Sequence, residues 1–124
     1  MIKEQGVEAL TEQLQNSQSE DVWQKCAGCL MVLAANSDKV KSLAGAEGAI
    51  PELTNIIRKA DANKQVLKAA LGALAVLSSD ERNLGKLRGE LGGIELDRYL
   101  REKDEKTVTF VKQVLARLYP DQAG

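Results

Sequence analysis

The sequence contains no histidine, the side chain that most often acts as a catalytic base or as a metal ligand. Cysteine is scarce as well, with two residues in 124, so the chain lacks the cysteines and histidines of a structural zinc site. Serine–histidine and cysteine–histidine nucleophiles are excluded for the same reason. We therefore expect a protein that is not an enzyme and that holds no metal and no other cofactor.

Aromatic residues make up only 3% of the chain, and there are two prolines. Any core must therefore be aliphatic, and little in the sequence would interrupt a helix. The chain is instead rich in Leu, Ala, Glu, Gln and Lys, which favour helix over strand. The composition predicts one all-α domain, because 124 residues are enough to enclose one core.

The sequence also lacks an excess of charge of either sign, since it has 17 basic and 18 acidic residues and a net charge of −1. Without a basic excess we expect no nucleic-acid partner. We also expect no membrane insertion, because no apolar run is long enough to cross a bilayer. A polar amino terminus and unpaired cysteines favour the cytoplasm, with the nucleus also open.

An internal repeat organises the sequence. Two apolar residues four apart recur every 43 residues, at Leu10 and Leu14, at Leu53 and Ile57, and at Leu96 and Leu100. A second set recurs after 44 and then 41 residues, namely Trp23, Cys26, Leu30 and Leu33, then Leu67, Ala70, Leu74 and Leu77, then Val108, Val111, Leu115 and Leu118. A period near 43 with helical spacing predicts a solenoid of small helical units.

We place the repeats at about 1–36, 37–78 and 79–119, with a tail at 120–124. Repeat one has only its second and third helices. Polar residues that would start helices are Ser19, Ser37, Asp61, Ser78 and Asp104, with breaks at Gly48 and Gly92 and a proline start at Pro51.

The apolar pattern also indicates which repeat lies in the middle of the stack and which lie at its ends. Residues 66–77 are apolar nearly all round, so this helix should be buried on both sides. The first and last helices carry more polar residues, which predicts polar outer faces at both ends of the stack. The chain would then be self-contained, although a fragment of a longer array is the alternative.

Residues 48–57 (GAIPELTNII) and 69–77 (AALGALAVL) resemble the second and third helices of armadillo repeats. HEAT repeats are the nearest competitor, but the short extra helices expected at 38–46 and 80–89 argue against them. The resemblance implies a right-handed superhelix whose third helices line a concave groove. It also implies that the groove binds protein or peptide partners.

Aligning the third helices assigns nine groove positions: Gln24, Gly28, Val32, Lys68, Gly72, Val76, Thr109, Gln113 and Arg117. None of the matching positions carries the Trp and Asn with which some armadillo proteins clamp an extended peptide. We expect instead a non-enzymatic adaptor or regulator that takes an amphipathic helix or apolar segment. Acidic groups on that partner would pair with Lys68 and Arg117.

Two alternatives stay open at Gly28 and Gly72: either a partner approaches closely there, or neighbouring helices do. Cys26 and Cys29 form a C-x-x-C pair, but both align with small residues and are expected to be buried. Trp23 aligns with core positions.

A second functional hypothesis is a structural or assembly module that stacks through its terminal helices, either as a homo-oligomer or within a longer array. Exposed apolar side chains at Ile2, Phe110 or Tyr119 would favour it.

Overall fold

The computed structural model describes residues 2–59, 63–91 and 96–120. These residues form helices and no strand, which confirms the all-α prediction. None of the described helices is both long enough and apolar enough to cross a membrane. The elements are α1 (Ile2–Asn16), α2 (Glu20–Ala35), α3 (Asp38–Ala46), α4 (Ala49–Lys59), α5 (Lys64–Leu77), α6 (Glu81–Leu91), the 3-10 helix η1 (Leu96–Arg101) and α7 (Glu105–Leu118).

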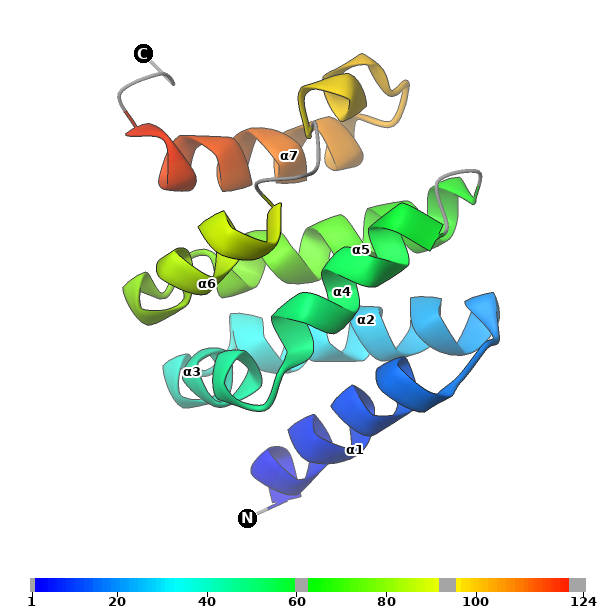
Figure 1. The fold of residues 1–124 in the computed structure, drawn as a ribbon, viewed down its shortest axis with the longest axis vertical. Helices are drawn as coiled ribbons and strands as arrows, with labels where there is room; N and C mark the ends of the chain where they lie inside the picture. The colour runs from blue at the N-terminus through cyan, green and yellow to red at the C-terminus, as the bar shows by residue number, and fades with distance from the viewer. Residues whose placement is uncertain (1, 60–62, 92–95, 121–124) are drawn as a thin grey trace.

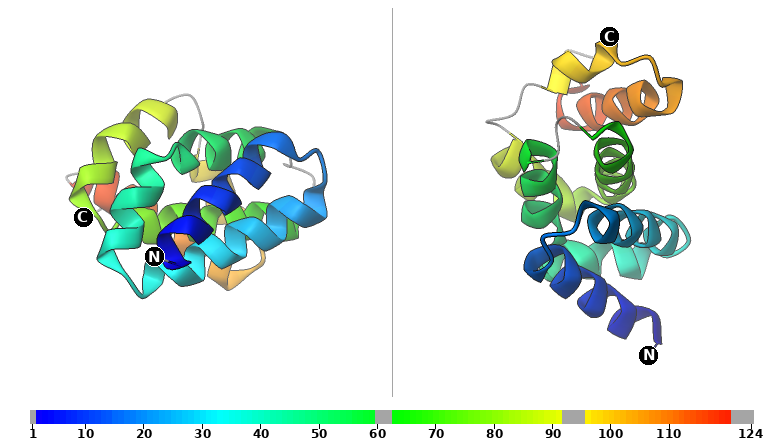
Figure 2. Two further views of the ribbon diagram at one scale, coloured as in Figure 1. Left: turned by 90° about the horizontal axis from the view of Figure 1, so that it is seen from below. Right: turned by 90° about the vertical axis from the view of Figure 1, so that its right-hand side faces the viewer.

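The helices stack in two layers (Figures 1 and 2). In one layer α2, α5 and α7 run side by side, and α5 packs against both of the others. In the other layer α4 packs on α5 and meets α1, α3 and α6. The first helix, α1, and the last helix, α7, therefore lie at opposite ends of the stack (Figure 1).

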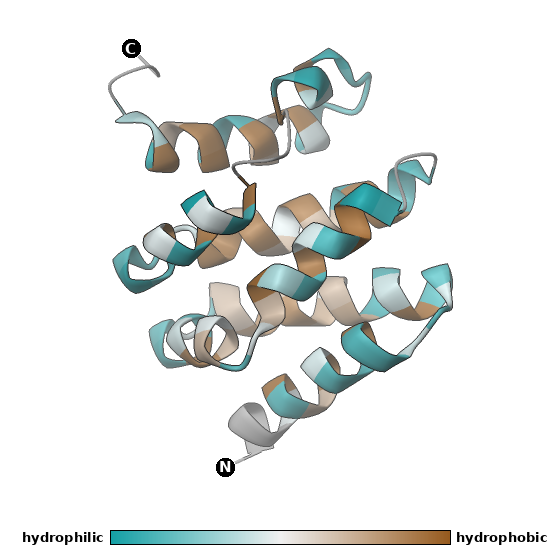
Figure 3. Ribbon diagram, viewed as in Figure 1, coloured by the Kyte–Doolittle hydropathy of each residue, from teal (hydrophilic) through white to brown (hydrophobic). Residues whose placement is uncertain are grey.

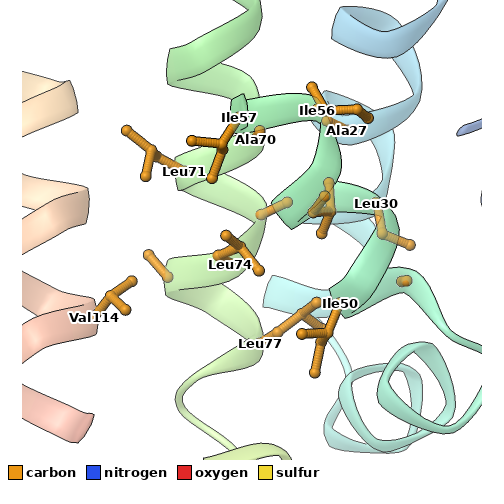
Figure 4. Close-up of a cluster of buried hydrophobic side chains, with 14 of the residues drawn as sticks. Ala27, Leu30, Ile50, Ile56, Ile57, Ala70, Leu71, Leu74, Leu77 and Val114 are labelled. Atoms are coloured by element: carbon orange, nitrogen blue, oxygen red, sulfur yellow. The ribbon is translucent and has the colours of Figure 1, made fainter. Parts of the chain in front are cut away.

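The central helix α5 is apolar on almost every side, and Figure 3 shows it brown along much of its length between α2 and α7. Leu67, Leu71, Leu74 and Leu77 have no exposed surface. In Figure 4, Leu71, Leu74 and Leu77 lie between Val114 of α7 on one side and the core residues Leu30 of α2 and Ile50 of α4 on the other. The prediction that the helix at 66–77 is buried on both sides is confirmed.

Three of the expected helix starts are confirmed. Ser19, Ser37 and Asp104 stand immediately before α2, α3 and α7, and each side chain accepts a hydrogen bond from a backbone N–H of the first turn. These bonds satisfy amides that have no partner inside the helix. Asp61 lies outside the described residues, and α5 is capped by Asn63, which accepts from Gln65 N and Val66 N.

The helix start expected at Ser78 is wrong. Ser78 follows the end of α5 and is buried, and its hydroxyl donates to Ala75 O at 2.6 Å. Asp80 instead precedes α6 and accepts from Arg82 N at 2.9 Å. Hydrogen bonds from the Arg82 side chain also hold the pKa of the Asp80 carboxyl below its usual value. A serine can bond back to its own helix as readily as forward to the next, and the sequence alone does not separate the two.

The break at Gly48 is confirmed, because this residue joins α3 to α4 with φ +90°, a conformation that favours glycine. Pro51 stands in the first turn of α4, where a missing N–H leaves no helical bond unmade. Gly92 lies outside the described residues. The second helix of the third predicted repeat is shorter and tighter than expected, since Leu96–Arg101 is a 3-10 helix with Leu96 and Tyr99 buried.

A buried amide ties α6 to the rest of the stack. Asn83 Nδ2 donates to Lys41 O in α3 and to Leu77 O at the end of α5, both at 3.0 Å. Gly45 leaves the space that the Asn83 amide occupies, because a side chain at residue 45 would collide with it.

Replacing Asn83 by Ala should lower the free energy of unfolding by about 1–3 kcal/mol, because the two hydrogen bonds that join α6 to α3 and α5 are lost. Urea denaturation measures the change. Glu81→Ala, at an exposed position of the same helix, is the matched control and should leave the midpoint almost unchanged. Equal midpoints for Asn83→Ala and the wild type would contradict this role.

Candidate functional site

Two neighbouring depressions lie where α2, α5 and α7 come together. The smaller, of about 280 Å³, is lined by Gln24, Gly28, Met31, Gln65, Lys68, Ala69, Lys106 and Phe110. The larger, of about 540 Å³, is lined by Met31, Val32, Ala35, Val76, Glu105, Lys106, Thr109 and Phe110. We call this surface the three-helix face. Six of the nine positions assigned from the sequence line it, namely Gln24, Gly28, Val32, Lys68, Val76 and Thr109.

Met31 of α2 and Phe110 of α7 meet over Gly72 of α5. A Cβ atom on Gly72 would lie 2.6 Å from Met31 Sδ and 3.0 Å from Phe110 Cε2. Gly72 is therefore buried beneath its neighbours and does not reach the surface. Of the two explanations for this glycine, close packing of helices accounts for it.

Gly28 differs from Gly72, although both occupy the same position in their repeats. No heavy atom lies within 4 Å of the place where a Cβ at residue 28 would stand, apart from its own helix and chain neighbours. Val32, one turn further along α2, exposes 57% of its surface. The part of the three-helix face around Gly28 and Val32 is therefore open and apolar, whereas its centre is filled by Met31 and Phe110.

The two basic groups expected to meet a partner's acid both have partners within the chain. Lys68 Nζ lies 3.0 Å from Asp104 Oδ2, and this hydrogen bond is the main reason that the pKa of Asp104 falls below its usual value. Arg117 donates to Ala75 O and, at 2.9 Å, to Ser78 Oγ, so it closes the end of α5. These contacts depend on loop and helix-end geometry that the repeat alignment does not contain.

The face also contains side chains that were not assigned to the groove from the sequence. Met31, Lys106 and Phe110 each line both depressions, yet none stands in the three aligned rows. Met31, one position before Val32, could have been predicted from the sequence, since an unbranched Met often fills a gap between helices. Gln113, which was in the aligned rows, is exposed and lines neither depression.

The cysteine prediction is only half right. Cys26 is buried, and burial raises the pKa of its thiol, with a smaller contribution from Cys29. Cys29 is exposed because it lines an open depression between α1 and α2, whereas the aligned Ala73 is buried in α5, which packs against both α2 and α7. No group of potential metal ligands occurs among the residues that the structure describes. Trp23 is in the core as predicted, and its Nε1 donates to Ser17 O at 2.8 Å.

Polar residues of the first helix are exposed at the amino-terminal end as expected, among them Glu8 and Glu12, but an apolar surface lies beside them. A depression of about 730 Å³ opens between α1 and α2, lined by Gly6, Ala9, Leu10, Gln24, Lys25, Gly28, Cys29, Val32 and Leu33. We call it the amino-terminal depression. Helical periodicity places Glu8 and Glu12 on the opposite side of α1 from this depression, whereas Gln13 follows Ala9 by one turn.

The side chains expected to reveal stacking at the ends give a mixed result. Tyr119 is 38% exposed, whereas Phe110 is half-buried over Gly72. The Ile2 side chain lies outside the described part of the chain.

Comparison with known proteins shows the fold alone. The chain is similar to two crystal structures of engineered proteins, each with a TM-score of 0.77. It is 23% identical to the first, with 94% of this chain and 47% of that chain covered, and 21% identical to the second, with 90% and 27% covered. This chain thus spans about half and about a quarter of their lengths. No protein-family model matches the sequence, and no curated protein matches it.

The two glycines give a paired test of the site. Gly28→Ala should raise the free energy of unfolding by about 0.5–1 kcal/mol, because alanine favours helix and the added methyl group meets no atom. Gly72→Ala should lose this gain, since Met31 and Phe110 must move. Urea denaturation of both variants at low protein concentration compares them, and equal stabilisation would contradict the packing over Gly72.

Proposed function

We propose that the chain is an armadillo-type repeat protein, a right-handed superhelix that binds another protein and catalyses no reaction. The 43–44-residue spacing and the order of the helices support this architecture, with α3, α4 and α5 as a complete middle unit. The case against catalysis rests on the sequence, which lacks histidine and any nucleophile–base pair.

The observation that carries the proposal is the larger depression of the three-helix face. Met31, Val32, Val76 and Phe110 give it an apolar floor, and Val32 exposes 57% of its surface there. Residues of α2, α5 and α7 all line it, and such an apolar floor suits one face of an amphipathic helix or a short apolar segment.

Lys106 takes the electrostatic role that the sequence gave to Lys68 and Arg117. It is exposed and lines both depressions, but the exposed Glu105 also lines the larger one, so a carboxylate on a partner would reach Lys106 from the side of the smaller depression. The nearby Lys68–Asp104 pair is already neutralised within the chain. The preferred partner is therefore an apolar segment with one acidic residue at its edge, in the cytoplasm or the nucleus.

A capture experiment tests the proposal. The variant carrying Val76→Glu and Thr109→Glu places two carboxylates in the larger depression. The matched control carries Gln13→Glu and Gln15→Glu at exposed positions of α1, which change the net charge equally. Wild type and control should retain the same proteins from a lysate, and the first variant should lose them, because burying a carboxylate against apolar surface is costly.

Circular dichroism must show that all three proteins are folded. Thr109→Glu alone, at an exposed position, replaces the double variant if the change at Val76 unfolds the chain. Retention of the same proteins by the folded variant would show that the three-helix face is not the binding surface.

A second candidate function is assembly through the terminal helices, the other hypothesis that the sequence raised. The amino-terminal depression favours it, because an apolar surface of this size at the end of a helical stack is a common place for another helix to pack.

A further inference from the structure

The two depressions of the three-helix face differ in chemistry, although they share a boundary. Met31, Lys106 and Phe110 line both of them. The rest of the larger depression is apolar except for Thr109 and the exposed Glu105. The rest of the smaller depression is mostly polar, as described next. A ligand that occupied both would therefore meet two different surfaces on either side of the place where Met31 and Phe110 meet.

The smaller depression is surrounded by hydrogen-bond donors. Four polar side chains line it, namely Gln24, Gln65, Lys68 and Lys106, and no carboxylate is among the described residues of its lining. Within the described part of the chain, the side chains of Gln24, Gln65 and Lys106 make no hydrogen bond and no ion pair. Lys68 is bound to Asp104, but an ammonium group has three N–H donors, and this contact uses one of them. Donors for an outside acceptor are therefore available from two helix pairs at once.

We propose that the smaller depression binds a side-chain carboxylate of the partner, and that the larger one binds aliphatic side chains of the same partner helix. A carboxylate has two oxygens and accepts up to about four hydrogen bonds, which suits the donors of Gln24, Gln65 and Lys106. Its bond to an ammonium group is stronger than a bond between neutral groups. This inference deepens the proposed binding at the three-helix face and rests on it.

The charge of Glu105 fixes which end of the motif goes where. Glu105 lines the larger depression and not the smaller one, so it repels a carboxylate placed on the larger side. Lys106 lies beside it in sequence and lines both depressions. The partner's acidic residue therefore meets Lys106 from the smaller side, and its aliphatic residues meet the apolar floor.

The geometry of α2 sets the spacing of the motif. Of the two depressions, Gln24 and Gly28 line only the smaller, and Val32 and Ala35 line only the larger. The midpoints of these pairs are seven to eight residues apart, which is about 11 Å at the rise of an α-helix. A partner helix that lies along α2 covers the same distance in the same number of residues. Its acidic and aliphatic residues should therefore be about seven positions apart, on one face.

Selection from a displayed library of random peptides about 20 residues long, enough for several helical turns, tests the motif. The wild type is the target, and the folded variant with Val76→Glu and Thr109→Glu removes peptides that bind elsewhere. The carboxyl terminus of each peptide is joined to the display scaffold, so that only side chains supply carboxylates. Enriched peptides should carry an Asp or Glu about seven positions from Leu, Ile, Val or Met.

Fluorescence anisotropy with an enriched peptide tests the carboxylate contact. Lys106→Met should weaken binding about tenfold, because a charge-assisted hydrogen bond is lost. Replacing the acidic residue of the peptide by its amide should have the same effect, and both changes together should add little, since they remove one interaction. Lys112→Met, at an exposed position of α7 that lines neither depression, is the matched control and should leave the affinity unchanged.

Several results would overturn the inference. Enriched peptides without an acidic residue, or equal weakening by Lys106→Met and Lys112→Met, would show that no carboxylate binds in the smaller depression, and would leave the proposed function intact. A spacing of about three residues would indicate an extended segment in place of a helix, because an extended chain rises about 3.3 Å per residue. If no peptide distinguishes the wild type from the double variant, the inference fails, and the lysate capture decides separately whether the face binds a protein.

Discussion

The burial of α5 from both sides is the constraint on which the rest of the structure depends. A helix that is apolar all round cannot face water, so α2 and α7 must lie along it and α4 must cover its third side. Its leucines have no exposed surface, and the ends of α5 are fixed by Asn63 at one end and by Arg117 and Ser78 at the other. The helices α2, α3, α4 and α7 pack on α5, and α1, α6 and η1 pack in turn on those.

The candidate binding surface is a consequence of that packing. Because α2, α5 and α7 lie side by side, the side chains between them must either interdigitate or leave a depression. Gly72 allows Met31 and Phe110 to meet at the centre, and the space on either side of that contact remains open. The same argument explains the amino-terminal depression, where α2 carries a repeat's contact surface but no described helix covers it.

Repetition made much of this fold predictable. The apolar spacing identified the helices, the buried middle helix and most of the caps, because those features depend on local sequence. The spacing also placed six groove positions on one surface. It did not show that Lys68 pairs with Asp104 or that Arg117 closes the end of α5, since both contacts join different repeats. The spacing also wrongly predicted that Cys29 is buried like the aligned Ala73. An alignment of repeats does not show which repeats are covered by another repeat on both sides.

Amide hydrogen exchange tests the central role of α5 most directly. If the stack depends on this helix, the amides of Val66–Leu77 should exchange most slowly and open only with global unfolding, while those of α1 and α7 exchange faster by local opening. As added urea lowers the free energy of global unfolding, the exchange rate of the α5 amides should rise in proportion to the unfolded population. If the amides of α5 were protected no better than those of α1, and well below the level expected for global unfolding, this account would be contradicted.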